Sequence, residues 1–131
     1  MVRILYIDDD FANRLLVKRI LSAEGYEMDE ADNARDGISM AESNPPDLIL
    51  MDIAMPDMNG LEATNVIRAI PAISKMTIIA LTANAMQGDR EKILEAGCDG
   101  YISKPIEVDT FVEQLSQYLQ VEGNYDEEKR S

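Results

Sequence analysis

Short apolar segments alternate along the chain with longer segments in which apolar residues recur every three or four positions. The short segments occupy residues 2–7, 26–31, 48–51, 76–81 and 101–103. The third and fourth are apolar at nearly every position, which is typical of strands covered on both faces in a parallel sheet. We therefore interpret the five short segments as the strands of one parallel sheet.

The longer segments have the spacing of amphipathic helices. They occupy residues 12–23, 34–41, 63–70, 86–97 and 108–119. Gly25 and Gly97 follow the first and fourth stripes, where a helix C-terminal cap favours glycine. Pro45 and Pro71 end the second and third. The last stripe is the clearest of the five, and the stripe in residues 86–97 is the weakest.

The order of elements, strand then helix five times, predicts an α/β fold with a single doubly wound (βα)5 domain. Right-handed crossovers and one switch point favour the flavodoxin-like order 2-1-3-4-5 for the five-stranded parallel sheet. A chain of 131 residues accommodates one such domain, which we place at residues 1–121. We expect residues 122–131 to form an acidic, disordered tail, and any output module to belong to another protein.

Polar residues that could take part in binding or catalysis follow four of the five expected strands. In open parallel sheets, binding sites form at the carboxyl ends of the strands, near the switch point. Three acids follow the first strand, a fourth follows the third strand, a hydroxyl follows the fourth, and a lysine before a proline follows the fifth. These residues are Asp8, Asp9, Asp10, Asp52, Thr82 and Lys104. Their shared placement predicts a site at this edge of the sheet.

Taken singly, each of these residues has an ordinary structural explanation. The acidic triplet suits a solvated turn that caps the next helix, Thr82 a plain strand residue, and Lys104 a surface lysine. Taken together, several carboxylates facing one another repel unless a cation lies between them. Oxygen ligands without histidine or cysteine favour a hard ion, Mg²⁺ or Mn²⁺. The bond between Lys104 and Pro105 is also one where a cis peptide is accessible, and a cis bond would direct the lysine across the site.

Charge and composition exclude several classes of function. The chain has 12 basic and 25 acidic residues, a formal net charge of −13, so direct binding to nucleic acid is disfavoured. A multivalent cation or a protein with a basic face is the more natural partner. No apolar run approaches the length of a membrane span, and the N-terminus lacks a signal-peptide pattern. The single Cys98 excludes an intramolecular disulfide and favours a cytoplasmic location.

Four motifs resemble the receiver domain of bacterial response regulators. They read LYIDDD, LILMDIAMPDMNG, IIALTANAMQGDREK and GCDGYISKPI, and the resemblance covers residues 2–121. The segments TANAMQGDRE and GYISKPI are also similar to those of DivK-like, stand-alone cell-cycle regulators and of receivers carried by hybrid histidine kinases. The resemblance implies a two-component signalling protein.

Carried over residue by residue, the resemblance implies that Asp52 is the phosphorylated aspartate. Asp9 would bind Mg²⁺ directly, Asp8 largely through water, and Asp52 and the main-chain carbonyl of Ala54 would complete the protein's ligands. Lys104 would contact a phosphoryl oxygen.

The remaining motif residues are implied to have conformational roles. Thr82 and Tyr101 would form the switch, with Thr82 also donating to the phosphoryl group. Ala54 and Asn84, two residues beyond Asp52 and Thr82, would tune hydrolysis. Pro56 and Gly60 would shape the loop after the acceptor, and Asp10 is expected to cap the first helix.

The implied function is acceptance of a phosphoryl group on Asp52 from a histidine kinase or a histidine phosphotransfer protein. This would switch a surface that binds a downstream protein, so the chain would catalyse only its own phosphorylation and dephosphorylation. The alternative is a pseudo-receiver that docks partners without accepting phosphate. A metal-dependent phosphatase would need a cap that the chain has no room for. A flavodoxin-like cofactor binder would need a phosphate loop where the three aspartates stand.

Overall fold

The computed structural model describes residues 2–85 and 88–130, with side chains up to Leu119. Five strands form one parallel sheet in the order β2-β1-β3-β4-β5, which confirms the predicted α/β class and strand order. The strands are β1 Arg3–Ile7, β2 Glu27–Ala31, β3 Leu48–Asp52, β4 Ile78–Thr82 and β5 Gly100–Ser103. The helices are α1 Phe11–Ala23, α2 Ala34–Ser43, α3 Gly60–Arg68, α4 Asp89–Glu95 and α5 Val108–Arg130.

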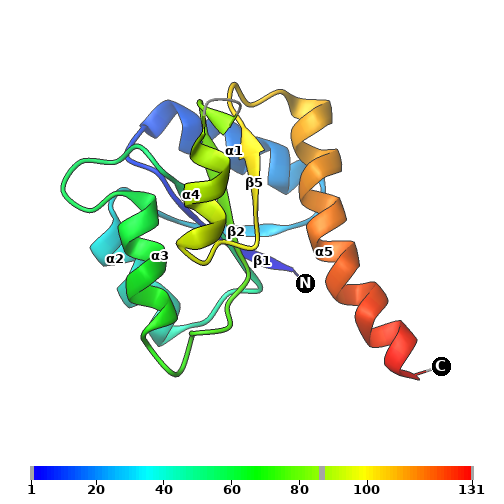
Figure 1. The fold of residues 1–131 in the computed structure, drawn as a ribbon. Helices are drawn as coiled ribbons and strands as arrows, with labels where there is room; N and C mark the ends of the chain where they lie inside the picture. Colours follow the sequence, from blue (N-terminus) through cyan, green and yellow to red (C-terminus); the bar gives the residue numbers. More distant parts are fainter. Residues whose placement is uncertain (1, 86–87, 131) are drawn as a thin grey trace.

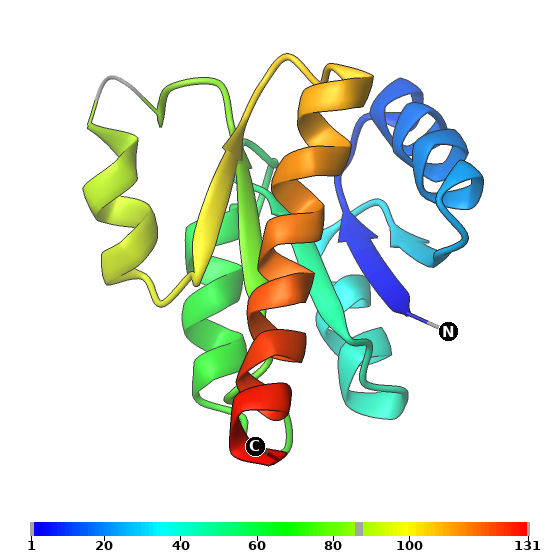
Figure 2. The same ribbon diagram turned by 90° about the vertical axis from the view of Figure 1, so that its right-hand side faces the viewer.

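Helices cover both faces of the sheet (Figures 1 and 2). Because side chains alternate along a strand, each strand contributes to two separate cores. On β1, for example, Leu5 and Ile7 pack toward α2, α3 and α4, whereas Ile4 and Tyr6 pack toward α1 and α5. All five residues of β3 and all five of β4 are buried. This explains why these two strands are apolar at almost every position.

The helix termini follow from short polar side chains and glycines in the sequence. The Asp10 carboxylate caps α1 by accepting hydrogen bonds from the main-chain N–H groups of Ala12 and Asn13. The expectation for Asp10 is thereby confirmed. Gly25 and Gly97, expected to end helices, both have left-handed φ angles, of 82° and 105°.

Two elements differ in extent from the sequence-based expectation. The helix expected in 86–97 is observed as α4 over Asp89–Glu95, and Met86 and Gln87 lie outside the described residues. At the other end, α5 runs to Arg130 and includes most of the segment 122–131. Disorder of that segment stays a prediction. Within the described part of the chain, no helix combines the length and apolar character that a membrane crossing requires.

Candidate functional site

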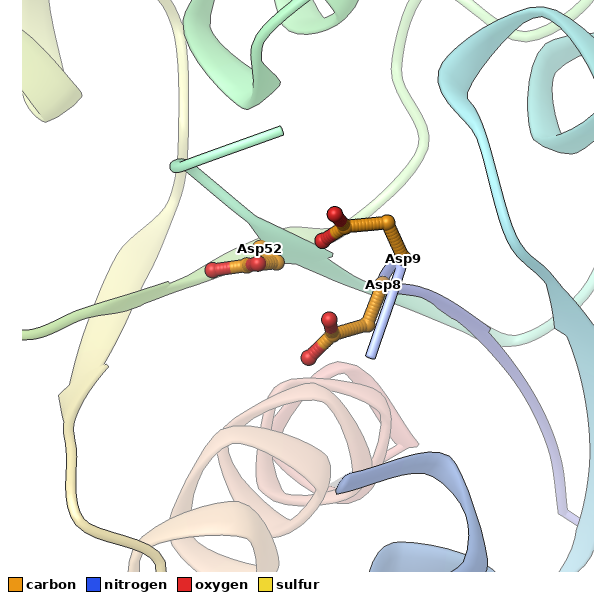
Figure 3. Close-up of side chains that lie close together, drawn as sticks. All are labelled: Asp8, Asp9 and Asp52. Carbon is orange, nitrogen blue, oxygen red and sulfur yellow. The ribbon is translucent and has the colours of Figure 1, made fainter. Parts of the chain in front are cut away.

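Three carboxylates converge at the carboxyl edge of the sheet. Asp52 is the last residue of β3, and Asp8 and Asp9 directly follow β1, its neighbour in the sheet. Each offers an oxygen within 4.8 Å of the others, and Figure 3 shows the three side chains gathered around one space. Asp8 and Asp52 are buried whereas Asp9 is exposed. The site is therefore closed on the protein side and open to solvent at Asp9.

Lys104 supplies positive charge to this cluster. Its Nζ lies 2.9 Å from Oδ1 of Asp52 and 4.0 Å from Oδ2 of Asp8. The main-chain N–H of Lys104 donates to the carbonyl of Thr82, which ties the segment after β5 to the end of β4. The peptide bond to Pro105 is cis. The structure thus brings together the residues predicted from strands one, three and five.

The Asp8 carboxylate is held by three donors. The hydroxyl of Tyr6 and the side-chain amide of Asn13, at 3.3 Å, donate to Oδ2, and the main-chain N–H of Asp10 donates to Oδ1 at 2.9 Å. Burial, and then the hydrogen bond to Asp8, raises the pKa of Tyr6 well above its usual value. The phenol therefore stays a donor at every physiological pH. Asp8 is fixed in one orientation before any ligand arrives.

Burial raises the pKa of Asp52 above its ordinary value of 3.8, and the charge of nearby Asp8 raises it further. The hydrogen bond from Lys104, its positive charge and the main-chain N–H of Ala54 act in the opposite direction. One ammonium thus faces three carboxylates, and the charge of Asp52 is incompletely compensated. An all-oxygen donor set with excess negative charge fits a hard divalent cation, which would supply the missing positive charge.

Thr82 and Tyr101 lie on neighbouring strands β4 and β5. The buried Thr82 hydroxyl donates to Oδ2 of Asp89 at 3.1 Å and accepts from the main-chain N–H of Asn84 at 3.0 Å. Half-buried Tyr101 packs against the core beneath α2, α3 and α4. Its main-chain N–H and carbonyl both bond the Tyr118 hydroxyl at 3.2 Å.

The loop between Asp52 and α3 approaches the end of β3 closely. A Cβ on Gly60 would overlap the carbonyl oxygen of Asp52 and lie 2.9 Å from the Cα of Ile53. The N–H of Gly60 also donates to the Ile53 carbonyl at 3.0 Å. Only glycine fits there, which supports the structural role expected for it. Pro56 is exposed within the same loop, as is Ala54 near the site.

The sequence did not single out Tyr6, Asn13 or Asp89 as site residues. Tyr6 has a recognisable signal in the sequence, since it lies two residues before Asp8 and therefore on the same face of β1. Asn13 and Asp89 touch the site only through the way α1 and α4 dock at the strand ends. The spacing of residues along the chain does not predict those contacts.

The fold and the site together define a doubly wound α/β protein with an acidic, lysine-containing cleft at the carboxyl edge of its sheet. Residues 4–116 match the family model of the response regulator receiver domain. The chain belongs to this family.

Similar proteins extend the comparison. The chain is 39% identical over 116 residues to the polar-differentiation response regulator DivK of Brucella anthropi, covering 88% of this chain and 94% of that protein. Among solved structures, the chemotaxis protein CheY4 of Vibrio cholerae superposes with a TM-score of 0.84 at 26% identity, covering 89% of this chain and 98% of that one. A receiver domain of a Pseudomonas aeruginosa sensor histidine kinase superposes at 0.80 with 36% identity, covering 91% and 94%. That structure has a magnesium ion coordinated in its active-site cleft.

Proposed function

We propose that this protein is a response-regulator receiver that accepts a phosphoryl group on Asp52. The observation that carries the proposal is the buried Asp52 carboxylate, 2.9 Å from the ammonium of Lys104 and beside Asp8 and Asp9. A carboxylate is a weak nucleophile, but phosphoryl transfer requires mainly alignment and neutralisation of charge. The site offers both on one rigid sheet edge.

The proposed metal is Mg²⁺, with Mn²⁺ as a substitute. Asp8, Asp9 and Asp52 would hold it with their carboxylates, together with the main-chain carbonyl of Ala54. The magnesium ion in the cleft of the Pseudomonas receiver supports this assignment. When bound, the ion supplies positive charge to the equatorial phosphoryl oxygens. The three donors to Asp8 hold its carboxylate in a fixed orientation before a metal ion binds.

The proposed donor is a phosphohistidine on a histidine kinase or a histidine phosphotransfer protein. A carboxylate oxygen of Asp52 forms a bond to phosphorus while the bond from phosphorus to the imidazole nitrogen breaks. The electron pair of that bond stays on the imidazole. Lys104 then shifts its contact from Asp52 Oδ1 to a phosphoryl oxygen, so its charge stabilises both the resting site and the product.

A protein rather than a small molecule is the proposed donor, because apolar side chains are exposed on α1, the helix that follows Asp8 and Asp9. Phe11 of α1 is 66% exposed, and Leu15 and Leu16 of the same helix are 38% and 36% exposed. Leu16 lines a hollow of about 450 Å³ together with residues of the segment after β5: Lys104, Pro105 and Ile106. A helical partner seated here would lie beside Lys104, which contacts Asp52.

Phosphorylation adds about two negative charges and changes local bonding rather than the global fold. We propose that the Thr82 hydroxyl moves to a phosphoryl oxygen and that Tyr101 enters the space it leaves. The equilibrium between two arrangements of the surface formed by α4, β5 and α5 then shifts, and the newly favoured arrangement binds a downstream protein. The chain would catalyse only its own phosphorylation and dephosphorylation, in the cytoplasm.

Ala54 and Asn84 are exposed and lie two residues beyond Asp52 and Thr82 in the sequence. We propose that their side chains control access of water to the acyl phosphate. Ala54→Arg and Asn84→Ala should each change the lifetime of the phosphorylated protein, measured by its decay after the donor is removed. Unchanged decay in both variants would contradict this role.

The proposal is tested with phosphoramidate, a small donor that carries the phosphorus–nitrogen bond. In the presence of Mg²⁺, the protein should gain a phosphoryl group that hydroxylamine removes, as expected for an acyl phosphate. Asp9→Asn should require much more Mg²⁺ for the same yield. A phosphoryl group that resists hydroxylamine, or none at all, would contradict an aspartyl acceptor.

A further inference from the structure

The hydroxyl of Thr82 is engaged outside the carboxylate cluster. Thr82 is only 3% exposed, and its Oγ1 donates to Oδ2 of Asp89 at 3.1 Å. The same oxygen accepts from the main-chain N–H of Asn84 at 3.0 Å. A hydroxyl has one hydrogen to donate. In this arrangement the hydroxyl donates that hydrogen to Asp89, so it cannot donate to a group on Asp52.

Asp89 is the first residue of α4, a helix with few ties to the rest of the domain. Within Asp89–Glu95, Ile93 is the buried side chain that anchors the helix to the core. The N-terminal cap residue of α4 is Gly88, which has no side chain with which to hold the first turn. The bond from Thr82 to Asp89 therefore ties the first turn of α4 to the carboxyl end of β4.

From this geometry we infer that Asp89 is a positioning residue that holds Thr82 in its unphosphorylated arrangement. The inference rests on the proposed phosphorylation of Asp52. A phosphoryl group on Asp52 and the carboxylate of Asp89 compete for the single hydrogen of Thr82. The phosphoryl group brings about two negative charges and three acceptor oxygens. The Thr82 hydroxyl therefore donates its hydrogen bond to the phosphoryl group instead of to Asp89. The first turn of α4 is then no longer hydrogen-bonded to β4.

The neighbouring residue links the same turn to the aromatic side chain on β5. The guanidinium carbon of Arg90 lies 5.9 Å from the centre of the Tyr101 ring, within the range of a cation–π contact. Release of Asp89 thus loosens a turn that touches both Thr82 and Tyr101. The first turn of α4 becomes the element that connects the state of Asp52 to the outer surface.

A purely structural role for Asp89 makes a different prediction. An acid in the first turn of a helix interacts favourably with the helix dipole, whatever Thr82 does. Glu91 is an exposed acid in the same turn. It offers a matched control, because it shares the dipole interaction and differs in its side-chain surroundings.

The experiment measures the affinity for beryllofluoride, a phosphoryl mimic, in the presence of Mg²⁺ by calorimetric titration. Asp89→Ala should bind it about three- to tenfold more tightly than wild type, because the competing hydrogen bond to a charged group is gone. Glu91→Ala should bind like wild type. In a Thr82→Ala background, Asp89→Ala should have no further effect. Asp89→Asn, with a neutral acceptor, should lie between wild type and Asp89→Ala, and serves if the alanine variant does not fold.

The outcomes separate this inference from the proposed function. If wild type fails to bind beryllofluoride with Mg²⁺, the phosphorylation proposal fails and the inference falls with it. If wild type binds but the Asp89 variants bind no more tightly, the role of Asp89 alone is overturned. The role of Asp89 is also overturned if Asp89→Ala still binds beryllofluoride more tightly in the Thr82→Ala background. The same holds if Glu91→Ala binds it as tightly as Asp89→Ala does.

Discussion

Replacing Lys104 by methionine removes the positive charge nearest the carboxylate cluster and keeps most of the aliphatic volume. The ammonium lies 2.9 Å from Asp52 and 4.0 Å from Asp8. At an effective dielectric constant of about 20, these pairs attract by about 6 and about 4 kcal/mol. Much of that attraction is offset by the cost of partly desolvating the ammonium, whose side chain keeps 22% exposure. We expect a net destabilisation of about 2–4 kcal/mol for the metal-free protein at neutral pH.

The loss should depend on pH, because the ammonium of Lys104 lowers the pKa of Asp52. Without it, burial and Asp8 raise that pKa further above the ordinary value of 3.8. The folded state then binds the proton more tightly than the unfolded state does. Stability of the variant therefore falls as pH rises from the ordinary value through the raised pKa. The difference from wild type is largest at neutral pH and shrinks in acid.

The assay is urea unfolding of both proteins in a metal chelator across this pH range, repeated with Mg²⁺. Added Mg²⁺ should recover part of the lost stability, since it restores positive charge among the carboxylates. Lys18→Met is the control. Its ammonium lies 3.7 Å from Glu30 on an exposed side chain, so it should cost at most about 1 kcal/mol. A loss of stability in Lys104→Met that is no larger than in this control, or that does not change with pH, would show that Lys104 does not stabilise the carboxylate cluster by its charge.

Three further predictions test separate parts of the structure. Gly60→Ala should cost about 2–3 kcal/mol in urea unfolding, because its methyl group would overlap the Asp52 backbone. Gly37→Ala should cost less, since its methyl group would meet the side chain of Ile7 rather than backbone, and alanine favours a helix interior over glycine; equal costs would contradict the backbone clash. Asp10→Ala should lose about 1 kcal/mol of stability as a helix cap and leave Mg²⁺ affinity unchanged in calorimetry; weakened affinity would make it a metal ligand. Tyr101→Ala should still be phosphorylated, yet lose the change in α4 hydrogen exchange that beryllofluoride induces in wild type; a retained change would argue against its switch role.

Much of the fold was predictable because β3 and β4 are buried on both faces and their sequences are correspondingly apolar. Parallel strands also place the residues that follow them at one edge. For this reason Asp8, Asp52 and Lys104 could be grouped into one site from their positions in the sequence alone. The extent of α4 was harder to predict, because its apolar stripe is weak and Ile93 alone is buried within Asp89–Glu95.

The contacts that orient the site were not predictable in the same way. Tyr6 and Asn13 both donate to Asp8, and Asp89 accepts from Thr82. Each bond depends on the rotation and docking of a helix or on the choice of a side-chain rotamer. Amphipathic spacing determines which face of a helix is buried, but not which polar group at its end meets a strand.

The most direct test of the central claim is intact mass after incubation with acetyl phosphate, with and without Mg²⁺, for wild type and Asp52→Asn. We expect a gain of one phosphoryl group that requires Mg²⁺ and is absent from the variant. No gain under any condition, or an equal gain in Asp52→Asn, would contradict the claim that Asp52 is the acceptor.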